Sequence, residues 1–467
     1  MLFNSLSFFY FFLALVAVNS VLPLRFRNAW ILTGGFIFYM SWSPPYILLL
    51  LLTAIVDYFV AIKMGSLADK KERKPWLIGS LIFNLGSLAF FKYTTMALGT
   101  AADLSSWLNL GWTPPLLEIA LPLGISFYTF ETISYGIDVY RGELKPKRNF
   151  FEYISFLMFF PKLIAGPIVR ASELLPQINM PRVCTSDAFR AGVNLMILGF
   201  AKKVLLADNF APLVERVFAN PGDFNRYMVI VAVYGYSMQV YFDFSAYSDI
   251  ARGCAKFLGY DLPENFNKPY LAVSISDFWR RWHLSLSRWM RDYLYVPLGG
   301  NLGSRLATYR NLFITMCLGG LWHGANWTFV IWGALNGAFL VIERVWHDWR
   351  GTKPKRAENM PLFEKLWRGL IVFNLITFTR IFFRAPDFGA AINVLSAIVN
   401  PGSMRATFDF ATFAIPAVTV AYIVLSRFRK DWLMFSPTGM RLTVYGAILA
   451  VFLAFGATNA EFIYFQF

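Results

Sequence analysis

The sequence predicts an all-α protein that crosses a membrane many times. Of its 467 residues, 57% are hydrophobic and only 15% are charged, whereas soluble domains carry about 25% charged residues. The hydrophobic residues form repeated runs long enough to cross a bilayer, which takes about 20 residues of α-helix. Basic residues gather between these runs, as in residues 70–74 and 145–148. This distribution is typical of the cytoplasmic loops of multi-pass membrane proteins.

About ten to twelve membrane-spanning helices are expected from the apolar runs. Residues 1–20 carry no Lys or Arg before their apolar core, so they are predicted to form the first span and not a cleavable signal. The run at residues 311–344 is too long for one crossing and is expected to be broken. The candidate spans are residues 2–22, 29–43, 46–64, 76–97, 116–140, 150–168, 189–207, 227–251, 311–344, 366–383, 410–426 and 442–455.

Loop charges predict the orientation of the first five spans. Basic and non-basic loops alternate up to residue 148, which places the N-terminus in the periplasm of a bacterial host and the protein in the inner membrane. Beyond residue 150 the basic and non-basic loops no longer alternate. A later segment is therefore expected to re-enter the membrane or to lie on its surface. Residues 268–301 are the best candidate, because their charged and aromatic residues alternate. They form either a segment buried in protein at membrane depth or an amphipathic helix on the cytoplasmic surface. The whole chain, residues 1–467, is predicted to be one membrane domain.

Several functional classes are disfavoured by the sequence. The net charge of +15 is explained by the loops and their attraction to anionic lipid, so nucleic acid is not expected as a partner. Cys184, Cys254 and Cys317 have no metal-ligand spacing, and no metal site is expected. The chain also lacks the Gly-x-Ser-x-Gly, Walker and His-Glu-x-x-His motifs. A serine-triad hydrolase and a metalloenzyme are therefore both disfavoured.

His323 is the strongest candidate for a catalytic residue. It is one of three histidines in the chain and lies in an apolar stretch, between Gly319-Gly320 and Gly324. An ionisable side chain in such a stretch is costly and indicates a functional site, and histidine transfers protons near neutral pH. The small neighbours allow two helices to approach closely. The alternative is a structural histidine hydrogen-bonded to a backbone carbonyl.

A second group of candidates lies upstream of His323. His283 follows Arg280 and Arg281, whose charges are expected to lower the pKa of the imidazole and keep it neutral. Arg280, Arg281 and Arg288 also have the geometry to bind phosphate groups. The alternative is a basic helix at the membrane surface. Asp243, in the span at residues 227–251, is expected either to pair with an arginine of residues 280–291 or to take part in the substrate site.

Trp322-His323-Gly324 resembles a motif of the membrane-bound O-acyltransferase family. The run from Phe278 to His283, about 40 residues upstream, resembles a second motif of the same family. Further segments in the same order resemble its bacterial branch, the alginate O-acetylases and their relatives. These segments are residues 123–131, 163–168, 241–245, 291–295 and 462–467. The resemblance covers nearly the whole chain.

The resemblance implies a ring of helices around a central tunnel, with a donor entrance on the cytoplasmic side and a funnel on the other. It implies that His323 is the catalytic histidine and that His283 occupies the family's second motif position. The acyl donor would be acetyl-CoA as a substrate, with no bound cofactor, and the phosphates of coenzyme A would lie on Arg280, Arg281 and Arg288. His323 would act as general base. The oxyanion would be stabilised by Trp322, Asn326 or backbone amides.

The acceptor implied by the resemblance is a secreted exopolysaccharide, cellulose or alginate, reached through a periplasmic SGNH-type acetyltransferase partner. Little sequence follows Phe455, which favours cellulose slightly. Residues 462–467 read Phe-x-Tyr-x-x-Phe, similar to the C-terminal motif of the partner peptide in teichoic acid D-alanylation. We therefore hypothesise that Tyr464 carries the acetyl group as a covalent relay; the alternative is an aromatic membrane anchor. For the whole protein, the alternatives are a non-enzymatic export component and an acyltransferase with a lipid or protein acceptor.

Overall fold

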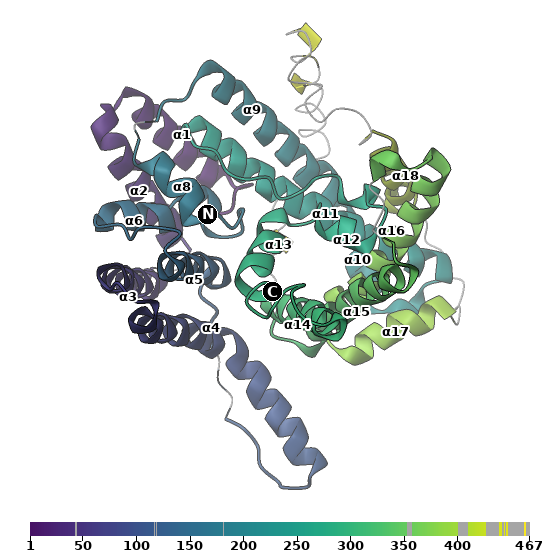
Figure 1. Ribbon diagram of the computed structural model, residues 1–467. Helices are drawn as coiled ribbons and strands as arrows, with labels where there is room; N and C mark the ends of the chain where they lie inside the picture. The colour runs from purple at the N-terminus through teal and green to yellow at the C-terminus, as the bar shows by residue number, and fades with distance from the viewer. Residues whose placement is uncertain are drawn as a thin grey trace. The chain divides into compact units, whose positions relative to one another are not determined.

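A computed structural model describes residues 1–42, 44–115, 117, 119–180, 182–352, 357–399 and 410–425, with residues 439–440, 443, 445–446 and 462–463 near the C-terminus. Every regular element in these ranges is helical, which confirms the predicted all-α class (Figure 1). By their contacts the residues fall into two compact units. The first comprises residues 1–192 and 251–263, and the second comprises residues 193–250 and 264–467.

The first unit contains the N-terminal helices. Three of them, α3, α4 and α5, pack side by side (Figure 1). Asp57 on α3 accepts hydrogen bonds from Ser80 (2.5 Å) and Asn84 (2.9 Å) on α4, and Thr132 on α5 donates to Asn84 at 2.9 Å. Because these buried polar groups bind one another, they join the three helices. The helices are α1 (Leu6–Val21), α2 (Leu24–Met40), α3 (Tyr46–Ser66), α4 (Lys70–Trp107), α5 (Ile125–Arg141), α6 (Phe150–Leu157), α7 (Phe160–Leu163) and α8 (Ala171–Ile178).

The prediction of a single span at residues 150–168 was wrong. The chain there forms the short helices α6 and α7, because Pro161 starts a new helix and cannot continue the previous one. Lys162 on α7 is buried and pairs with Glu131 on α5, while its ammonium group lies 4.5 Å from the centre of the Phe156 ring. The break therefore places a buried cation where a continuous apolar helix was expected.

The second unit contains the C-terminal helices and carries all the candidate site residues that the structure describes. Its elements are the π-helix η1 (Ala201–Ala207), α10 (Asp208–Ala219), η2 (Pro221–Asp223), η3 (Pro269–Leu271), α12 (Ile275–Trp279), α13 (Leu284–Met290), the π-helix η4 (Arg291–Tyr295), α14 (Arg305–His323), α15 (Trp327–Arg350), η5 (Ala357–Asn359), α16 (Leu362–Arg384), α17 (Phe388–Val399) and α18 (Phe410–Leu425). Two helices, α9 (Ser186–Phe200) and α11 (Arg226–Phe257), contribute residues to both units.

The break expected within residues 311–344 is confirmed. Helix α14 ends at His323 and α15 begins at Trp327, and the two pack against each other as a hairpin (Figure 1). A Cβ atom at Gly320 would lie 2.2 Å from the carbonyl oxygen of Phe329, and one at Gly333 would lie 2.4 Å from that of Met316. Such distances are too short for any residue but glycine, so small residues permit the close packing that the sequence predicted.

Four of the described helices are long and apolar enough to cross a membrane, namely α3, α4, α15 and α16. Shorter apolar helices occur at Leu6–Val21, Phe388–Val399 and Thr412–Tyr422. These findings confirm a membrane protein with several spans, while the total of ten to twelve stays a prediction. The span expected at residues 442–455 lies outside the described residues, apart from three positions.

Candidate active site

His323 lies at the wall of a cavity of about 510 Å³ in the second unit. Its position is set by the end of α14, because the helix stops at His323 and Gly324 continues in an extended conformation. Arg280, Arg288 and Arg291 line the same cavity. The structure therefore brings the predicted catalytic histidine together with two of the three predicted phosphate-binding arginines.

Aromatic rings surround the imidazole of His323. The ring centres of Trp322, Trp332 and Phe383 lie 5.0, 5.1 and 5.3 Å from its own, and only 6% of the residue is exposed. Much of the remaining cavity wall is also apolar, with Leu284, Leu286, Met290, Leu312, Met316 and Leu340. Apolar walls disfavour water, and exclusion of water strengthens electrostatic interactions and limits hydrolysis of a reactive acyl group.

The segment at residues 268–301 is a chain of short helices packed in the second unit. Phe278 and Trp282 are each only 1% exposed, which does not fit one long amphipathic helix lying on a surface. The turn between α12 and α13 is made by His283, whose φ of 43° lies in the left-handed region. Asn265 fixes this turn, since its carbonyl oxygen accepts from the Leu284 amide at 2.9 Å and its side chain accepts from the Ser285 hydroxyl at 2.6 Å.

His283 is fully buried and does not line the cavity. Its ring packs edge-on against Phe244 at 4.6 Å and against Trp322 at 6.1 Å, measured between ring centres. Neither ring nitrogen has a hydrogen-bond partner among the described residues. Burial lowers the pKa of His283 to about 3, so the ring is neutral as expected. The predicted cause was wrong, because loss of solvent lowers this pKa and the neighbouring arginines do not.

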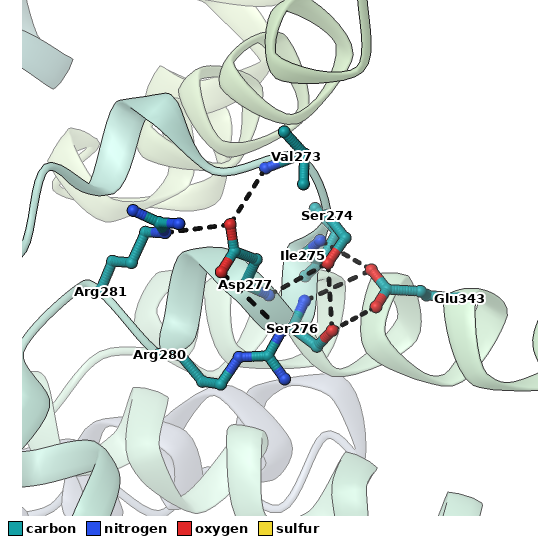
Figure 2. Close-up of polar contacts among 8 residues, drawn as sticks. All are labelled: Val273, Ser274, Ile275, Ser276, Asp277, Arg280, Arg281 and Glu343. Carbon is teal, nitrogen blue, oxygen red and sulfur yellow. Dashed lines mark hydrogen bonds and ion pairs between the residues drawn. The ribbon is translucent and has the colours of Figure 1, made fainter. Parts of the chain in front are cut away.

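Asp277 contacts both Arg280 and Arg281, but at different distances. It accepts a hydrogen bond from Nε of Arg281 at 3.0 Å, and a longer ion pair of 3.8 Å joins it to Arg280 (Figure 2). Arg280 lines the cavity that contains His323, whereas Arg281 lines a separate cavity with Lys268. The prediction that Arg280, Arg281 and Arg288 form one phosphate site is therefore corrected to Arg280 and Arg288, with Arg291 as the third cation of the cavity.

Glu343 on α15 holds the start of α12. Its carboxylate accepts hydrogen bonds from the amides of Ile275 (2.7 Å) and Ser276 (3.3 Å) and from the Ser276 hydroxyl (Figure 2). A carboxylate at a helix N-terminus satisfies amides that lack partners within the helix. Glu343 therefore fixes the short helix that carries Trp279 and leads into Arg280.

Trp322 and Asn326 do not line the cavity. Trp322 is 4% exposed and packs between His283 and His323. The side chain of Asn326 caps α15 by accepting from the Thr328 amide at 2.9 Å and donates to the Pro386 carbonyl at 2.6 Å. Both groups of the Asn326 amide are therefore engaged in structure, which disfavours its predicted role as an oxyanion donor.

Asp243 has a different partner from the predicted arginine. Its carboxylate pairs with Nζ of Lys203 at 2.7 Å, and Lys203 also pairs with Asp208 at 2.8 Å. The second oxygen of Asp243 accepts from the backbone amide of Ile463 at 2.8 Å. All three charged side chains are buried. The predicted pair with an arginine was wrong, because the cation that the structure places on Asp243 is Lys203, which η1 carries.

The described part of the C-terminal motif is docked in protein. Phe462 is 1% and Ile463 is 4% exposed. The Phe462 ring lies 4.4 Å from Nζ of Lys203 and packs at right angles against Tyr247 at 4.8 Å. This burial does not fit an aromatic anchor in lipid at these two residues. Tyr464 lies outside the described residues.

Three residues of this region were not predicted. Lys203 could have been found, because a lysine in an apolar run is as unusual as a histidine there. Arg291 had a signal in its spacing of three from Arg288, which puts two residues on one helix face. Trp332 had no signal, because a tryptophan in an apolar helix is ordinary and only the fold places its ring against His323.

Comparison with known proteins places this site in a family. A model of the membrane-bound O-acyltransferase family matches residues 141–384. The chain is 38% identical over 435 residues to the probable alginate O-acetylase AlgI of Azotobacter vinelandii, covering 91% of this chain and 84% of that protein. It is 37% identical over 420 residues to the peptidoglycan O-acetyltransferase of Helicobacter pylori, covering 84% and 76%. It is 31% identical over 292 residues to the teichoic acid D-alanyltransferase of Streptococcus thermophilus, covering 58% and 69%. The chain belongs to the membrane-bound O-acyltransferase family and is an O-acyltransferase.

Proposed function

We propose that this protein transfers acetyl groups from cytoplasmic acetyl-CoA across the bacterial inner membrane for the O-acetylation of a secreted polysaccharide. One observation carries the proposal: His323 shares a largely apolar cavity with Arg280, Arg288 and Arg291. Guanidinium groups bind phosphates well, as coenzyme A requires, and an imidazole is suited to take the proton of an attacking hydroxyl. The names of relatives that acetylate alginate and peptidoglycan support the same reaction.

The proposed reaction is an acyl transfer in which His323 accepts and then returns one proton. The hydroxyl oxygen of the acceptor forms a bond to the thioester carbonyl carbon, and His323 takes the hydroxyl proton. The carbonyl electrons move onto its oxygen, giving a tetrahedral oxyanion. When the carbonyl re-forms, the carbon–sulfur bond breaks, and the thiolate takes the proton from His323. The products are an acetyl ester and free coenzyme A, and the imidazole returns to its starting state.

The first acceptor that we propose is Tyr464. The two described residues of the tail support this, since Asp243 holds the Ile463 amide and Phe462 packs against Lys203 and Tyr247. The acetylated tyrosine would then pass its acetyl group to a polymer hydroxyl on a periplasmic SGNH-type partner transferase and recover its own hydroxyl.

The polymer we propose is cellulose or alginate. The alginate O-acetylases among the relatives favour alginate, and the peptidoglycan enzyme shows that a relative acts on another polymer. A non-enzymatic export component is set aside, because the chain belongs to an acyltransferase family. Acetylation of a lipid or of another protein is the remaining alternative, and the experiment below separates it.

The test uses the full-length protein in lipid nanodiscs with acetyl-CoA labelled in its acetyl group. We expect release of free thiol and label on the C-terminal peptide, seen by mass spectrometry. His323→Ala should lower the release of thiol by about 10²–10⁴-fold, and Tyr464→Phe should remove the label from the tail. Full activity of His323→Ala would overturn the proposal. Normal polymer acetylation in cells that carry Tyr464→Phe would overturn the relay alone, and label in lipid would favour the alternative acceptor.

A further inference from the structure

An arginine is buried behind the aromatic wall of the active site. Arg380 on α16 is only 2% exposed. Its guanidinium carbon lies 4.4 Å from the ring centre of Trp282, 5.3 Å from that of Phe383 and 5.8 Å from that of Trp332. Its guanidinium hydrogen-bonds the Tyr270 side chain, whereas its Nε and Nη2 have no hydrogen-bond partner among the described residues.

Such an arginine is expensive to bury. Moving a cation out of water has a large free-energy cost, and proteins normally offset this cost with a paired carboxylate. Contacts between the cation and aromatic rings offset only part of it. Arg380 therefore carries a positive charge that no described acid neutralises, and such a charge favours negative charge that forms nearby.

Trp332 links this cation to the catalytic histidine. Its ring stands perpendicular to that of His323 at 5.1 Å and lines the cavity. Its indole Nε1 is buried and has no hydrogen-bond partner among the described residues. Phe383 likewise contacts both His323 and Arg380. An indole donor that no described residue engages therefore lies beside the general base, with a positive charge behind it.

We propose that Nε1 of Trp332 donates a hydrogen bond to the oxyanion formed during acyl transfer, and that the charge of Arg380 supports it. The inference rests on the reaction proposed above. As the carbonyl carbon of the thioester becomes tetrahedral, its oxygen takes a full negative charge. Trp332 is the catalytic residue that binds this oxygen. Arg380 is a positioning residue, whose guanidinium holds the Trp332 and Trp282 rings and favours negative charge nearby. Asn326 cannot take the same role, because its side chain caps α15.

The first test substitutes Trp332 and measures single-turnover thiol release from acetyl-CoA in nanodiscs; kcat here denotes the maximal rate constant of that turnover, and KM the acetyl-CoA concentration that gives half of it. Trp332→Phe keeps an aromatic ring and removes the N–H, so kcat should fall about 10²–10³-fold, as for loss of one oxyanion donor, with little change in KM. Trp332→Gln restores an N–H donor and should recover part of kcat. Trp279→Phe is the matched comparison. The Trp279 indole also lines the cavity, packs on Trp332 at 5.9 Å and has no described hydrogen-bond partner for its Nε1, but no described ring contact joins it to His323. Trp279→Phe should change mainly KM.

The second test separates function from structure at Arg380. Arg380→Met removes a buried charge that no described acid pairs with, so it should raise or maintain the melting temperature while lowering kcat. Arg380→Lys should retain more of kcat than Met does. A purely structural arginine predicts the reverse, with a lower melting temperature and a kcat near wild type.

The outcomes distinguish this inference from the proposed function. If His323→Ala abolishes thiol release and Trp332→Phe keeps wild-type kcat, the oxyanion assignment fails and the general base stands. A large loss of kcat in Trp279→Phe alone would transfer the donor role to that indole. If His323→Ala remains active, both conclusions fail together.

Discussion

The carboxylate of Glu343 binds both the amide and the hydroxyl of Ser276, and so joins α15, which carries Trp332, to α12. Helix α12 has only five residues, too few to be stable by itself. The bonds from Glu343 therefore decide where the helix starts and, through it, where Arg280 enters the cavity. This relationship makes the donor site depend on a residue that does not line it.

Glu343→Ala should therefore weaken donor binding. Loss of hydrogen bonds to a carboxylate costs about 1–3 kcal/mol, and the freed α12 should move Arg280, so KM for acetyl-CoA should rise more than kcat falls. Glu343→Gln keeps an acceptor oxygen, so its KM for acetyl-CoA should lie between those of the wild type and Glu343→Ala. Single-turnover kinetics at varied acetyl-CoA concentration and thermal unfolding, both in nanodiscs, measure the two effects. Glu364→Gln is the control, because its pair with Arg368 at 3.0 Å joins residues of one helix and is worth little. An unchanged KM in Glu343→Ala would refute this role.

His283 should make stability depend on pH. Its pKa is lowered from 6.5 to about 3 by burial, so the unfolded chain takes up a proton below pH 6.5 and the folded chain does not. Its contribution to stability is therefore fully present above pH 6.5 and is lost as the pH falls toward 3. Each pH unit in this window costs about 1.4 kcal/mol.

Melting temperatures at pH 7.0 and 4.5 test this prediction. His283→Asn removes the titrating ring and suits the left-handed backbone, so its melting temperature should fall less between the two pH values than that of the wild type. His347→Asn is the control, because His347 lies at the end of α15 and bonds the Thr352 hydroxyl. Equal pH dependence in all three proteins would contradict the prediction.

Adjacent glycines in α14 should differ in their tolerance of a methyl group. A Cβ at Gly320 would lie 2.2 Å from the Phe329 carbonyl, whereas one at Gly319 would find nothing nearer than Met290 Cε at 3.9 Å. Gly320→Ala should destabilise the protein by about 1–3 kcal/mol or more. Gly319→Ala should be neutral or stabilising by up to about 1 kcal/mol, because alanine favours helix. Thermal unfolding of both variants tests this difference in stability. Equal melting temperatures would count against the close packing of α14 and α15.

Substitutions in the buried cluster of Lys203, Asp208 and Asp243 should differ in how much stability they cost. Lys203→Met leaves two buried carboxylates without their cation, and we expect a loss of about 3–5 kcal/mol. Asp243→Asn leaves Lys203 paired with Asp208 at 2.8 Å and keeps an oxygen for the Ile463 amide, so it should cost less. Thermal unfolding ranks the two variants. The reverse order would show that the tail contact outweighs the ion pair.

Docking of the tail gives the Lys203→Met variant a second readout. Release of the tail should expose its peptide bonds, so a protease should cut near residue 463 faster in Lys203→Met than in the wild type. Asp187→Asn, which alters an exposed 3.8 Å pair in α9, should be cut at the wild-type rate.

Hydrophobicity alone identified the class of this protein, and the rarity of histidine in apolar sequence identified His323. The break before Trp327 and the close approach at Gly320 also followed from residue types that have one main physical use. These predictions succeeded because they depend on local chemistry: the cost of an ionisable group in an apolar run, or the size of a missing side chain. The prediction of a single span at residues 150–168 failed because apolar content alone does not show that a helix has ended.

The tertiary structure decided which side chains meet. Arg280 and Arg281 are neighbours in sequence, yet Asp277 holds them at different cavities. Asp243 pairs with Lys203, 40 residues away along the chain, and the indole of Trp332 reaches His323 only because α14 and α15 fold back on each other. Residue types predict which groups need a partner, because burial makes an unpaired charge or donor costly. They do not predict which partner is chosen, because that depends on the packing of helices far apart in the chain.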